Sequence, residues 1–417
     1  MEEEVVDESF FIDDAGSATP DIELQKTGLE NTYTERQIGS ITKAIEPVSG
    51  QSSLDTVVEM FRNQSDLQAV PIEETGSVIG VIERKTVEEA TNTALKRFVA
   101  KNCIDYVVDA KLTLNARDFC ELVVGKVDET VKSTGIQNFV VLLNNRSYLG
   151  IVSADEIRSQ IEAVRAHDLE KAKVIQQHLL PNDDSTKDFP FHVAIYNQMA
   201  NAVGGDFYIA QRVSQTSFVI GSFDVSGKNV SAALLTVTIG SYFATLKQLV
   251  HSTLSAVQIA TMLDRFLATV VPVGNFITGA ICYIDALENQ IEILNCGHTD
   301  VYAAKKNDKD EVQVATLKPT LPPFGMGAVA DALKSSGKAG YRLAITSGVQ
   351  IGMYSDGLTD MQDDDGVRFD EENTKKFFID LYNRDVADME KFTARTVERW
   401  IQHAMLPDDI TVVNLRF

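Results

Sequence analysis

Apolar and polar positions follow two different periods along this chain, and the change of period divides it into regions. Between residues 41 and 157 the same succession occurs twice, with a helical spacing of apolar residues followed by two short strand-like runs. The first copy places the helix at 53–61 and the strands at 69–72 and 78–82, and the second copy places them at 116–124, 138–143 and 148–152. This internal repeat predicts two small modules of mixed structure.

One unbroken helical pattern follows the repeat. Neither Gly nor Pro occurs between Asp155 and Leu180, and Pro181 ends the pattern. A helix of about 25 residues is about 37 Å long. Its apolar stripe consists of Ile157, Ile161, Val164, Ala172, Ile175 and Leu179. Two interpretations stay open: residues 156–181 join two copies of the chain as a parallel coiled coil, or the helix packs on its own domain.

The remainder of the chain mixes the two periods. Strand-like apolar runs occupy 191–197, 217–224, 276–285, 290–296, 349–355 and 410–417. Helical spacing occurs at 231–250, 255–271 and 388–405. A polar segment at 182–189 separates this region from the long helix. We therefore expect residues 182–417 to form a mixed α/β (α+β) domain.

Charge is the most unusual feature of the composition. The chain has 60 Asp and Glu residues against 38 Lys and Arg residues, a formal net charge of −22, although its 44% hydrophobic residues are typical of a globular protein. Proteins that bind nucleic acid or anionic membranes do so with Lys and Arg, so this charge argues against both partners. Residues 1–35 hold eleven acids and one base, Lys26, and we expect a mobile solvated tail, although Phe10-Phe11-Ile12 offers an apolar docking segment.

Cysteine and targeting patterns indicate a cytoplasmic protein. Cys103, Cys120, Cys282 and Cys296 form no C-x-x-C pair and lie within apolar runs, as expected for reduced core residues. The acidic N-terminal segment lacks the basic region of a signal peptide. The most apolar long stretch, 249–284, is interrupted by polar residues, so we expect no membrane span.

Aspartates stand at the ends of apolar runs in the last region. Asp206 follows Val-Gly-Gly, Asp224 and Asp356 each end a strand-like run, and Asp408 with its neighbour precedes another. Taken singly, each is most simply a turn residue or a helix cap. A carboxylate beside a buried strand is costly unless a positive group compensates. Gathered at one sheet edge, these side chains would form an all-oxygen site suited to Mg²⁺ or Mn²⁺.

Five motifs in this region follow one order. They are Val203-Gly204-Gly205-Asp206-Phe207-Tyr208, Asp224-Val225-Ser226-Gly227-Lys228, Cys296-Gly297-His298, Tyr354-Ser355-Asp356-Gly357-Leu358-Thr359-Asp360 and Asp408-Asp409-Ile410-Thr411. In this order they resemble the SpoIIE-like branch of the metal-dependent PPM serine/threonine phosphatases, and the resemblance spans residues 182–417. It implies an α-β-β-α sandwich with two Mn²⁺ or Mg²⁺ ions at one end of the paired sheets.

The resemblance also implies roles for individual residues. Asp224 would bridge the two metal ions, and the Val225 carbonyl would complete the ligands of one of them. Asp356 and Asp408 would hold the other, and Asp206 would bind a metal ion or orient its ligands. Two such ions lower the pKa of a bridging water and hold the phosphoryl oxygens, so that water attacks in line without a phosphoenzyme.

Other residues near these motifs have less definite roles. Asp409 is a near neighbour of the implied ligands. His298 either shapes the site from its turn or is simply a hydrogen-bonded turn histidine. The chain departs from the family pattern at Ile209, Asn229 and Thr299-Asp300, none of which is an implied metal ligand. These departures concern substrate contacts and loop conformation.

The repeated region resembles a second family. Its plan of helix, strand, turn and strand over residues 36–155 is similar to a pair of CBS domains, which stack into a disc and often bind adenine nucleotides between them. CBS domains that bind adenosine often carry Ser or Thr and, three residues later, an acid after the second strand, and Ser153 and Glu156 match these positions. The same spacing is that of a helix capping box, so a purely structural role for the pair stays open.

These features together predict a regulated phosphatase that removes phosphate from serine or threonine of a partner protein, with the CBS-like pair as sensor. By resemblance, the substrate would be an anti-sigma-factor antagonist or a similar small bacterial regulator. The competing hypothesis is a non-enzymatic regulator whose degenerate phosphatase-like domain binds a phosphoprotein. Retention of the four carboxylates argues against degeneracy, because an unused cluster of like charges would destabilise the fold. We also expect a homodimer joined along residues 156–180.

Overall fold

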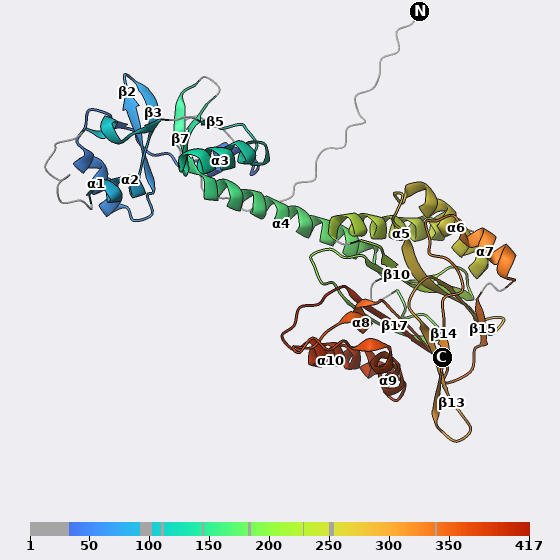
Figure 1. The fold of residues 1–417 in the computed structure, drawn as a ribbon. Coiled ribbons are helices and arrows are strands. Elements are labelled where there is room, and N and C mark those ends of the chain that lie inside the picture. Colours follow the sequence, from blue (N-terminus) through green and yellow to red (C-terminus); the bar gives the residue numbers. More distant parts are fainter. Residues whose placement is uncertain are drawn as a thin grey trace, which may run out of the picture. The chain divides into compact units, whose positions relative to one another are not determined.

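The chain consists of two compact units, Met1–Val164 and Arg165–Phe417, whose elements are labelled in Figure 1. The computed structural model describes residues 33–91, 102–109, 112–143, 146–181, 185–227, 229–249, 254–337 and 340–417. Most of the expected acidic tail and the expected turn at Asn144-Asn145 lie outside these residues. Both units combine helices with sheets, so the predicted mixed α+β class is confirmed.

The first unit contains the predicted repeat. In the first copy, β1 (Val48–Ser49), α1 (Leu54–Asn63), β2 (Ala69–Glu74) and β3 (Ser77–Glu83) precede α2 (Arg84–Thr91). In the second copy, β5 (Thr113–Asn115), α3 (Cys120–Thr134), β6 (Asn138–Leu142) and β7 (Tyr148–Ser153) precede α4 (Ala154–Leu179). In each copy the first strand pairs in parallel with the second, which pairs antiparallel with the third. The short elements are η1 (Ile38–Ile41), η3 (Cys103–Tyr106) and β4 (Val108–Asp109).

Helix α3 begins and ends later than its sequence pattern predicted. Residues before Cys120 form a turn instead, in which the Asn115 side chain accepts a hydrogen bond from the Arg117 N–H at 2.9 Å. The helix continues to Thr134 and ends where Gly135 adopts a left-handed conformation, with φ at +76°. Asn favours such turns, and glycine tolerates this φ without steric cost.

Each copy of the repeat has its own apolar core, and a third cluster joins the copies. In this third cluster Ala69 and Val81 from the first sheet pack with Val140 and Ile151 from the second. Val81 and Ile151 lie at matching positions of β3 and β7, and Ala69 and Val140 lie two positions apart on the matching strands β2 and β6. The unit is therefore held together by the faces of its two small sheets.

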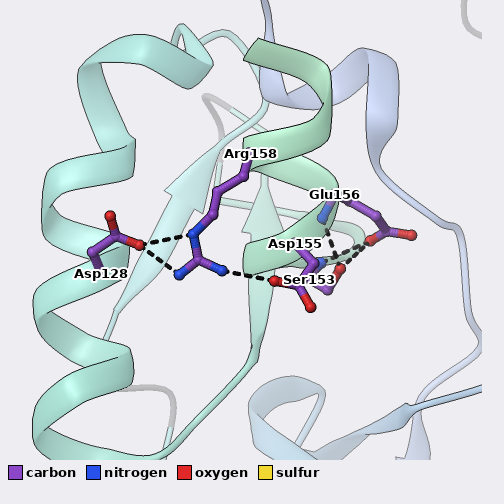
Figure 2. A network of polar contacts seen from close by, with 5 residues as sticks. All are labelled: Asp128, Ser153, Asp155, Glu156 and Arg158. Atoms are coloured by element: carbon purple, nitrogen blue, oxygen red, sulfur yellow. Dashed lines mark hydrogen bonds and ion pairs between the residues drawn. The ribbon is translucent and has the colours of Figure 1, made fainter. Parts of the chain in front are cut away.

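The beginning of α4 packs on the second copy. Ile157 and Ile161 are buried in its core. Arg158 donates from Nη2 and Nε to Asp128 Oδ1 of α3, at 2.6 and 3.1 Å, and from Nη1 to Asp155 Oδ1 at 2.7 Å (Figure 2). Strand β7 runs directly into α4 without a loop, which keeps these first turns against their own sheet.

The two ends of α4 differ in exposure. Ile161 is 6% exposed, whereas Ile175 is 59% exposed. The prediction that Ile161 lies at a coiled-coil seam is therefore wrong, because its side chain is already buried in its own domain. The alternative interpretation, a helix packed on its own domain, holds for these first turns, and at the other end Gln176 and Leu179 pack within the second unit.

The second unit is built from two five-stranded antiparallel sheets. The first has the order β15-β12-β11-β10-β9 and the second the order β14-β13-β16-β17-β8. Their strands are β8 (His192–Gln198), β9 (Asp206–Arg212), β10 (Ser217–Val225), β11 (Ile277–Asp285), β12 (Gln290–Cys296), β13 (Val301–Lys306), β14 (Val312–Leu317), β15 (Tyr341–Ala344), β16 (Gln350–Tyr354) and β17 (Ile410–Arg416).

In the second unit the layers follow the order helices, sheet, sheet, helices (Figure 1). An apolar cluster lies between each two neighbouring layers. One cluster joins the inner faces of the two sheets, and the other two join each sheet to its own helices. The first sheet is covered by α5 (Asn229–Leu249), α6 (Ala256–Val270) and α7 (Val329–Ser336). The second is covered by α8 (Gly357–Asp360), α9 (Asp370–Tyr382) and α10 (Met389–Ile401), with η4 (Val386–Asp388) before α10.

Helix α5 is unusually apolar. Within the described part of the chain, its stretch Val230–Gln248 has the length and composition that a membrane-spanning helix needs, and 39% of that stretch is buried. Ile239, Phe243 and Leu246 belong to the core between α5 and the first sheet. These three residues explain part of the helix's apolar character by packing inside the unit.

Candidate metal centre

Two aspartates face each other at one end of the first sheet. Strand β9 begins at Asp206, and the antiparallel register places Asp224 of β10 opposite it. Asp206 is only 2% exposed, and its Oδ2 accepts a hydrogen bond from Thr411 Oγ1 at 2.6 Å. Burial and the negative charge of Asp224 raise the pKa of Asp206 well above its ordinary range. The ionised pair is therefore costly unless a cation compensates.

The second sheet brings an Asp-Asp pair to the same end. This pair, Asp408 and Asp409, directly precedes strand β17, which packs against β9 and β10 of the first sheet. Asp409 is buried, and its two carboxylate oxygens accept hydrogen bonds from the Ala200 N–H at 2.8 Å and the Gly205 N–H at 2.7 Å. Asp408 is half-buried, and its Oδ1 accepts from the Asp409 N–H at 3.0 Å. Asp409 therefore anchors the loop that leads into Asp206.

Glycines allow the chain to pass close to this anchor. A Cβ added to Gly204 would lie 2.2 Å from Asp409 Oδ2, and one added to Gly357 would lie 1.9 Å from the Asp409 carbonyl oxygen. Any larger residue at either position would displace Asp409. The glycines of the Gly-Gly-Asp and Asp-Gly motifs are therefore required for steric reasons, in addition to the aspartates beside them.

Asp356 reaches this end from strand β16. It is exposed and stands at the beginning of α8, two residues after the strand ends. The preceding Ser355 is buried, accepts a hydrogen bond from the Thr411 N–H at 2.9 Å, and donates to the Asp409 carbonyl at 3.2 Å. Ser355 therefore fixes the chain at Asp356 against the beginning of β17.

The gathered carboxylates have the chemistry of a site for hard divalent cations. Among the residues that the structure describes, no three His, Cys, Asp or Glu side chains form a complete metal-ligand group. The acids instead interact as pairs: Asp224 and Asp409 each raise the pKa of Asp206, and Asp408 raises that of Asp409, in addition to the larger effect of burial. Carboxylate oxygens suit Mg²⁺ or Mn²⁺, and a cation would remove this repulsion. The donor set therefore fits such ions.

His298 is a buried turn residue. It is 4% exposed, and its ring nitrogens Nδ1 and Nε2 lie 3.1 Å from Thr278 Oγ1 and 3.2 Å from Ser222 Oγ. Its own N–H donates to Asn295 Oδ1 at 2.9 Å. Burial lowers the pKa of His298 to about 4, so the ring is neutral at physiological pH. These contacts agree with a hydrogen-bonded turn histidine.

A cavity of about 530 Å³ adjoins the centre. His298 and Asp356 contribute to its lining, together with Asp300, two residues after His298, and Arg368, which lies outside the five motifs. Arg368 forms an ion pair with Asp360. Burial raises the pKa of Asp300. Sequence reasoning did not identify Arg368, because nothing in its local pattern distinguishes it from any other loop arginine.

Ser153 and Glu156 lie in the first unit and form a capping box at the start of α4 (Figure 2). The Glu156 N–H donates to Ser153 Oγ at 3.1 Å, and Glu156 Oε2 accepts from the Ser153 N–H at 2.8 Å. Glu156 Oε1 also forms an ion pair of 2.5 Å with Lys43 Nζ. The helix-capping role that the sequence left open for Ser153 and Glu156 is therefore present in the structure.

The same residues border a cavity between the two copies of the repeat. This cavity has a volume of about 230 Å³, and its lining includes Lys43, Asp66, Asn138, Ser153 and Glu156. Lys43 brings a positive charge, while Asn138 brings amide groups. The cavity offers groups that complement a phosphate and a polar ring, so the capping role does not exclude a binding role.

Gln176 connects the other end of α4 to the candidate centre. It is 3% exposed, and its Nε2 donates to the Gly204 carbonyl and to Thr236 Oγ1 of α5, each at 2.7 Å. The Gly204 N–H donates back to Gln176 Oε1 at 3.2 Å. Sequence reasoning missed this residue, although a signal exists: Gln176 stands on the apolar stripe of the helix, between Ala172 and Leu179.

The neutral state of His298 predicts acid sensitivity. Its folded pKa of about 4 lies below the ordinary value of 6.5, so its contribution to stability is complete above pH 6.5 and is lost as pH falls toward 4. Between pH 7.5 and 4.5 we expect the free energy of unfolding to fall by about 2–3 kcal/mol more in the wild type than in His298→Asn. Urea unfolding of both proteins across this range measures the difference. Asp206, whose raised pKa has the opposite effect, is common to both proteins and cancels, and parallel curves would contradict the prediction.

Comparison with known proteins agrees with the motifs. The family model for stage II sporulation protein E (SpoIIE) matches residues 214–417. The phosphoserine phosphatase RsbP of Bacillus subtilis is 25% identical over 197 residues, which are 46% of this chain and 45% of RsbP, so the chain spans less than half the length of this curated relative. The PP2C domain of SiaA from Pseudomonas aeruginosa has a similar structure, with a TM-score of 0.52, 20% identity, and coverage of 62% of this chain and 98% of that domain. Residues 214–417 therefore match the SpoIIE family model, and the second unit has a fold similar to that of a PP2C domain.

Proposed function

We propose that residues 182–417 are a metal-dependent protein serine/threonine phosphatase and that the first unit is a CBS pair that regulates it. The observation that carries the proposal is the pairing of Asp206 with Asp224 at one end of the first sheet, next to Asp409 of the second sheet. Asp224, Asp356 and Asp408 lie within the residues that match the SpoIIE family model. The α-β-β-α sandwich of PPM phosphatases corresponds to the stacking of helices and sheets in the second unit.

In this proposal each carboxylate has its own part. Asp224 and the Val225 carbonyl would hold one divalent cation, Mn²⁺ or Mg²⁺, and Asp356 and Asp408, with Asp224 between the two ions, would hold a second. Asp206, fixed by Thr411, binds an ion or orients the carboxylate of Asp224. The ions supply an activated water and neutralise the phosphoryl oxygens during in-line attack. The chain itself supplies positioned carboxylates, because Asp206 and Asp224 lie in strands and Asp356 and Asp408 lie within two residues of one.

The competing proposal is a non-enzymatic regulator that binds a phosphoprotein without hydrolysing it. The raised pKa of Asp206 argues against it. A domain that had lost its metal would gain stability by replacing a buried acid among like charges with a neutral residue. A hydrolysis assay on a phosphoserine peptide, with and without Mn²⁺, separates the two proposals.

The substrate we propose is a phosphorylated signalling protein in the cytoplasm, such as an anti-sigma-factor antagonist. RsbP, the curated relative, is named a phosphoserine phosphatase, which supports phosphoserine as the group removed. The high negative charge of the chain supports a protein partner over nucleic acid or an anionic membrane.

We propose that the cavity between the two copies of the repeat binds an adenine nucleotide. The copies share one topology and pack through matching strands, as a CBS pair does. Lys43 would meet a phosphate, and Ser153 or Glu156 would meet the ribose. Because Lys43 already pairs with Glu156 on the first turn of α4, a ligand that takes over Lys43 would alter the beginning of that helix.

We further propose that the chain is a homodimer and that α4 passes the sensor state to the phosphatase. Val174 and Ile175 are 45% and 59% exposed on the second half of this helix, which supports an interface there. Gln176, on the next position, bonds both the Gly204 loop and α5, so a movement of the helix would act directly on the segment before Asp206. In this proposal the receiver of the signal is therefore α5 together with the Gly204 loop.

The metal-ligand assignment predicts a large loss of turnover. Asp224→Asn and Asp356→Asn should each lower kcat on a phosphoserine peptide by on the order of a thousandfold, because a misplaced ion removes both water activation and charge stabilisation. Chelation should abolish activity in the wild type, and Mn²⁺ should restore it. Asp331→Asn, an exposed aspartate on α7, is the matched control and should retain full activity. Near wild-type rates in either ligand variant would overturn the assignment.

The sensor assignment predicts nucleotide binding. In calorimetry with the full chain, at least one of AMP, ATP or a cyclic dinucleotide should bind, and Glu156→Gln should weaken its affinity by about tenfold through loss of a charged hydrogen bond. Glu162→Gln, at an exposed position of the same helix, is the control and should leave the affinity unchanged. Absence of heat with all of these nucleotides would favour a sensor unit that only mediates dimerisation.

The interface assignment predicts different outcomes at two isoleucines of one helix. Ile175→Asp should convert a dimer into a monomer in light scattering, because it places like charges across the interface. Ile161→Asp should instead expose the backbone amides of β6 and β7 to hydrogen exchange, because an unpaired charge in that core costs about 3–5 kcal/mol. A monomeric wild type, or a dimer that survives Ile175→Asp, would refute the interface.

A further inference from the structure

Asp264 is a buried carboxylate with an unusual set of partners. It lies on α6 and is 1% exposed. Its Oδ1 accepts hydrogen bonds from the Gly325 N–H at 3.0 Å and the Gly327 N–H at 3.2 Å, and its Oδ2 accepts from the Val329 N–H at 3.0 Å. Charged acceptors make stronger hydrogen bonds than neutral ones. One side chain therefore holds the backbone of the loop 321–329 at three points.

The loop needs this support because its own conformation is demanding. Gly325 and Gly327 have φ values of +88° and +67°, in the left-handed region, and Pro322-Pro323 precedes them without backbone N–H groups to donate. Successive N–H groups of such a loop point the same way and require an acceptor. Asp264 supplies that acceptor from a helix, so the shape of the loop depends on a residue about 60 positions away.

The loop in turn supports the strand next to the proposed ligands. The Phe324 N–H donates to the Ile277 carbonyl at 2.8 Å, and the Ile277 N–H donates to the Phe324 carbonyl at 3.0 Å. On its other side Ile277 pairs with Val225. The Phe324 ring lies 6.0 Å from that of Phe223, the residue before Asp224. Only strand β11 thus separates the loop from the segment that carries Asp224, the proposed bridging carboxylate.

A second pair of hydrogen bonds completes the path. The Ser226 N–H donates to the Phe276 carbonyl at 3.0 Å, and the Phe276 N–H donates to Ser226 Oγ at 2.8 Å. Ile277 is therefore bonded to the loop on one side and lies opposite Val225 on the other, while its neighbour Phe276 is bonded to Ser226. Apart from the contact between the Phe324 and Phe223 rings and the hydrogen bond to Ser226 Oγ, the contacts between the loop and this segment join backbone groups only. A shift of the loop would therefore be passed on as a shift of the main chain.

We infer that Asp264 is a positioning residue for the metal-ligand segment Asp224–Ser226, acting through the loop 321–329. The inference rests on the proposed function in one respect, that this segment binds the metal. It assigns a purpose to the Gly325-Met326-Gly327 sequence, which no metal-ligand motif includes. It also explains why a carboxylate is buried in α6 with only N–H groups as its partners.

The test compares Asp264→Asn with a matched structural control in the full chain. Asparagine keeps an oxygen for Gly325 and Gly327 but turns an NH₂ group toward the Val329 N–H. Ile259→Ala removes apolar contacts from the same helix and should lower the melting temperature, but it leaves the three hydrogen bonds from the loop to Asp264 in place. In the metal-free protein, Asp264→Asn should speed hydrogen exchange of the amides at 224–227 and 275–278, and Ile259→Ala should not.

Metal binding gives the second measurement. In calorimetry with Mn²⁺ alone, Asp264→Asn should weaken affinity by about tenfold, the lower end of the effects seen for residues that support metal ligands, and Ile259→Ala should leave it unchanged. Unaltered exchange in Asp264→Asn, or an equal effect of both variants, would overturn the inference. If the wild type neither binds Mn²⁺ nor hydrolyses phosphoserine, the proposed function fails, and the exchange comparison alone then decides whether Asp264 positions this segment.

Discussion

The candidate centre depends on a buried carboxylate that is not itself one of the proposed ligands. Asp409 accepts hydrogen bonds from the Ala200 and Gly205 N–H groups, and its own carbonyl accepts one from Ser355. Through it the beginning of β17, the end of β16 and the connection from β8 to β9 are held at one point. Burial raises the pKa of Asp409, which shows that these bonds compensate only part of the cost of removing it from water. The gain is a fixed relation between the two sheets, which the hydrogen bond from Thr411 Oγ1 to Asp206 Oδ2 reinforces. The apolar contacts between the sheets are not directional and would not fix this relation by themselves.

The strand-end aspartates could be predicted from the sequence because the evidence for each is local. An apolar run that ends in an acid, as at Asp224, indicates both the strand and the place where it leaves the core. The inward member of the Asp408-Asp409 pair could not be predicted in this way. Its orientation follows from the register of β17 on β8, in which Ile410 lies opposite Gln198, and register is a long-range property.

The long helix shows a similar limit. A stripe of apolar residues identifies the face that is buried, but it does not identify what buries it. Ile161 and Ile175 stand on one stripe, yet the first packs in the core of the second repeat copy and the second is exposed. The capping box at Ser153 and Glu156 has the same ambiguity, since a local motif fixes local hydrogen bonds and leaves the remaining oxygen, which here pairs with Lys43, undetermined.

Gln176 and Asp264 support the candidate centre through main-chain groups rather than through the side chains of the proposed ligands. Gln176 bonds the carbonyl and the N–H of Gly204, and Asp264 bonds the N–H groups of Gly325 and Gly327. Such contacts cannot be recognised from the ligand motifs, because any residues that adopt the same backbone conformation can make these hydrogen bonds. They are nevertheless strong enough to matter, since an unmade buried hydrogen bond costs about 1–3 kcal/mol. A coupling free energy of that size changes an equilibrium by about 5- to 150-fold. A regulatory signal in α4 that lengthened only the Gln176 bonds to Gly204 would therefore be sufficient to change the occupancy of the active arrangement, without any change in the pairing of the strands next to the carboxylates.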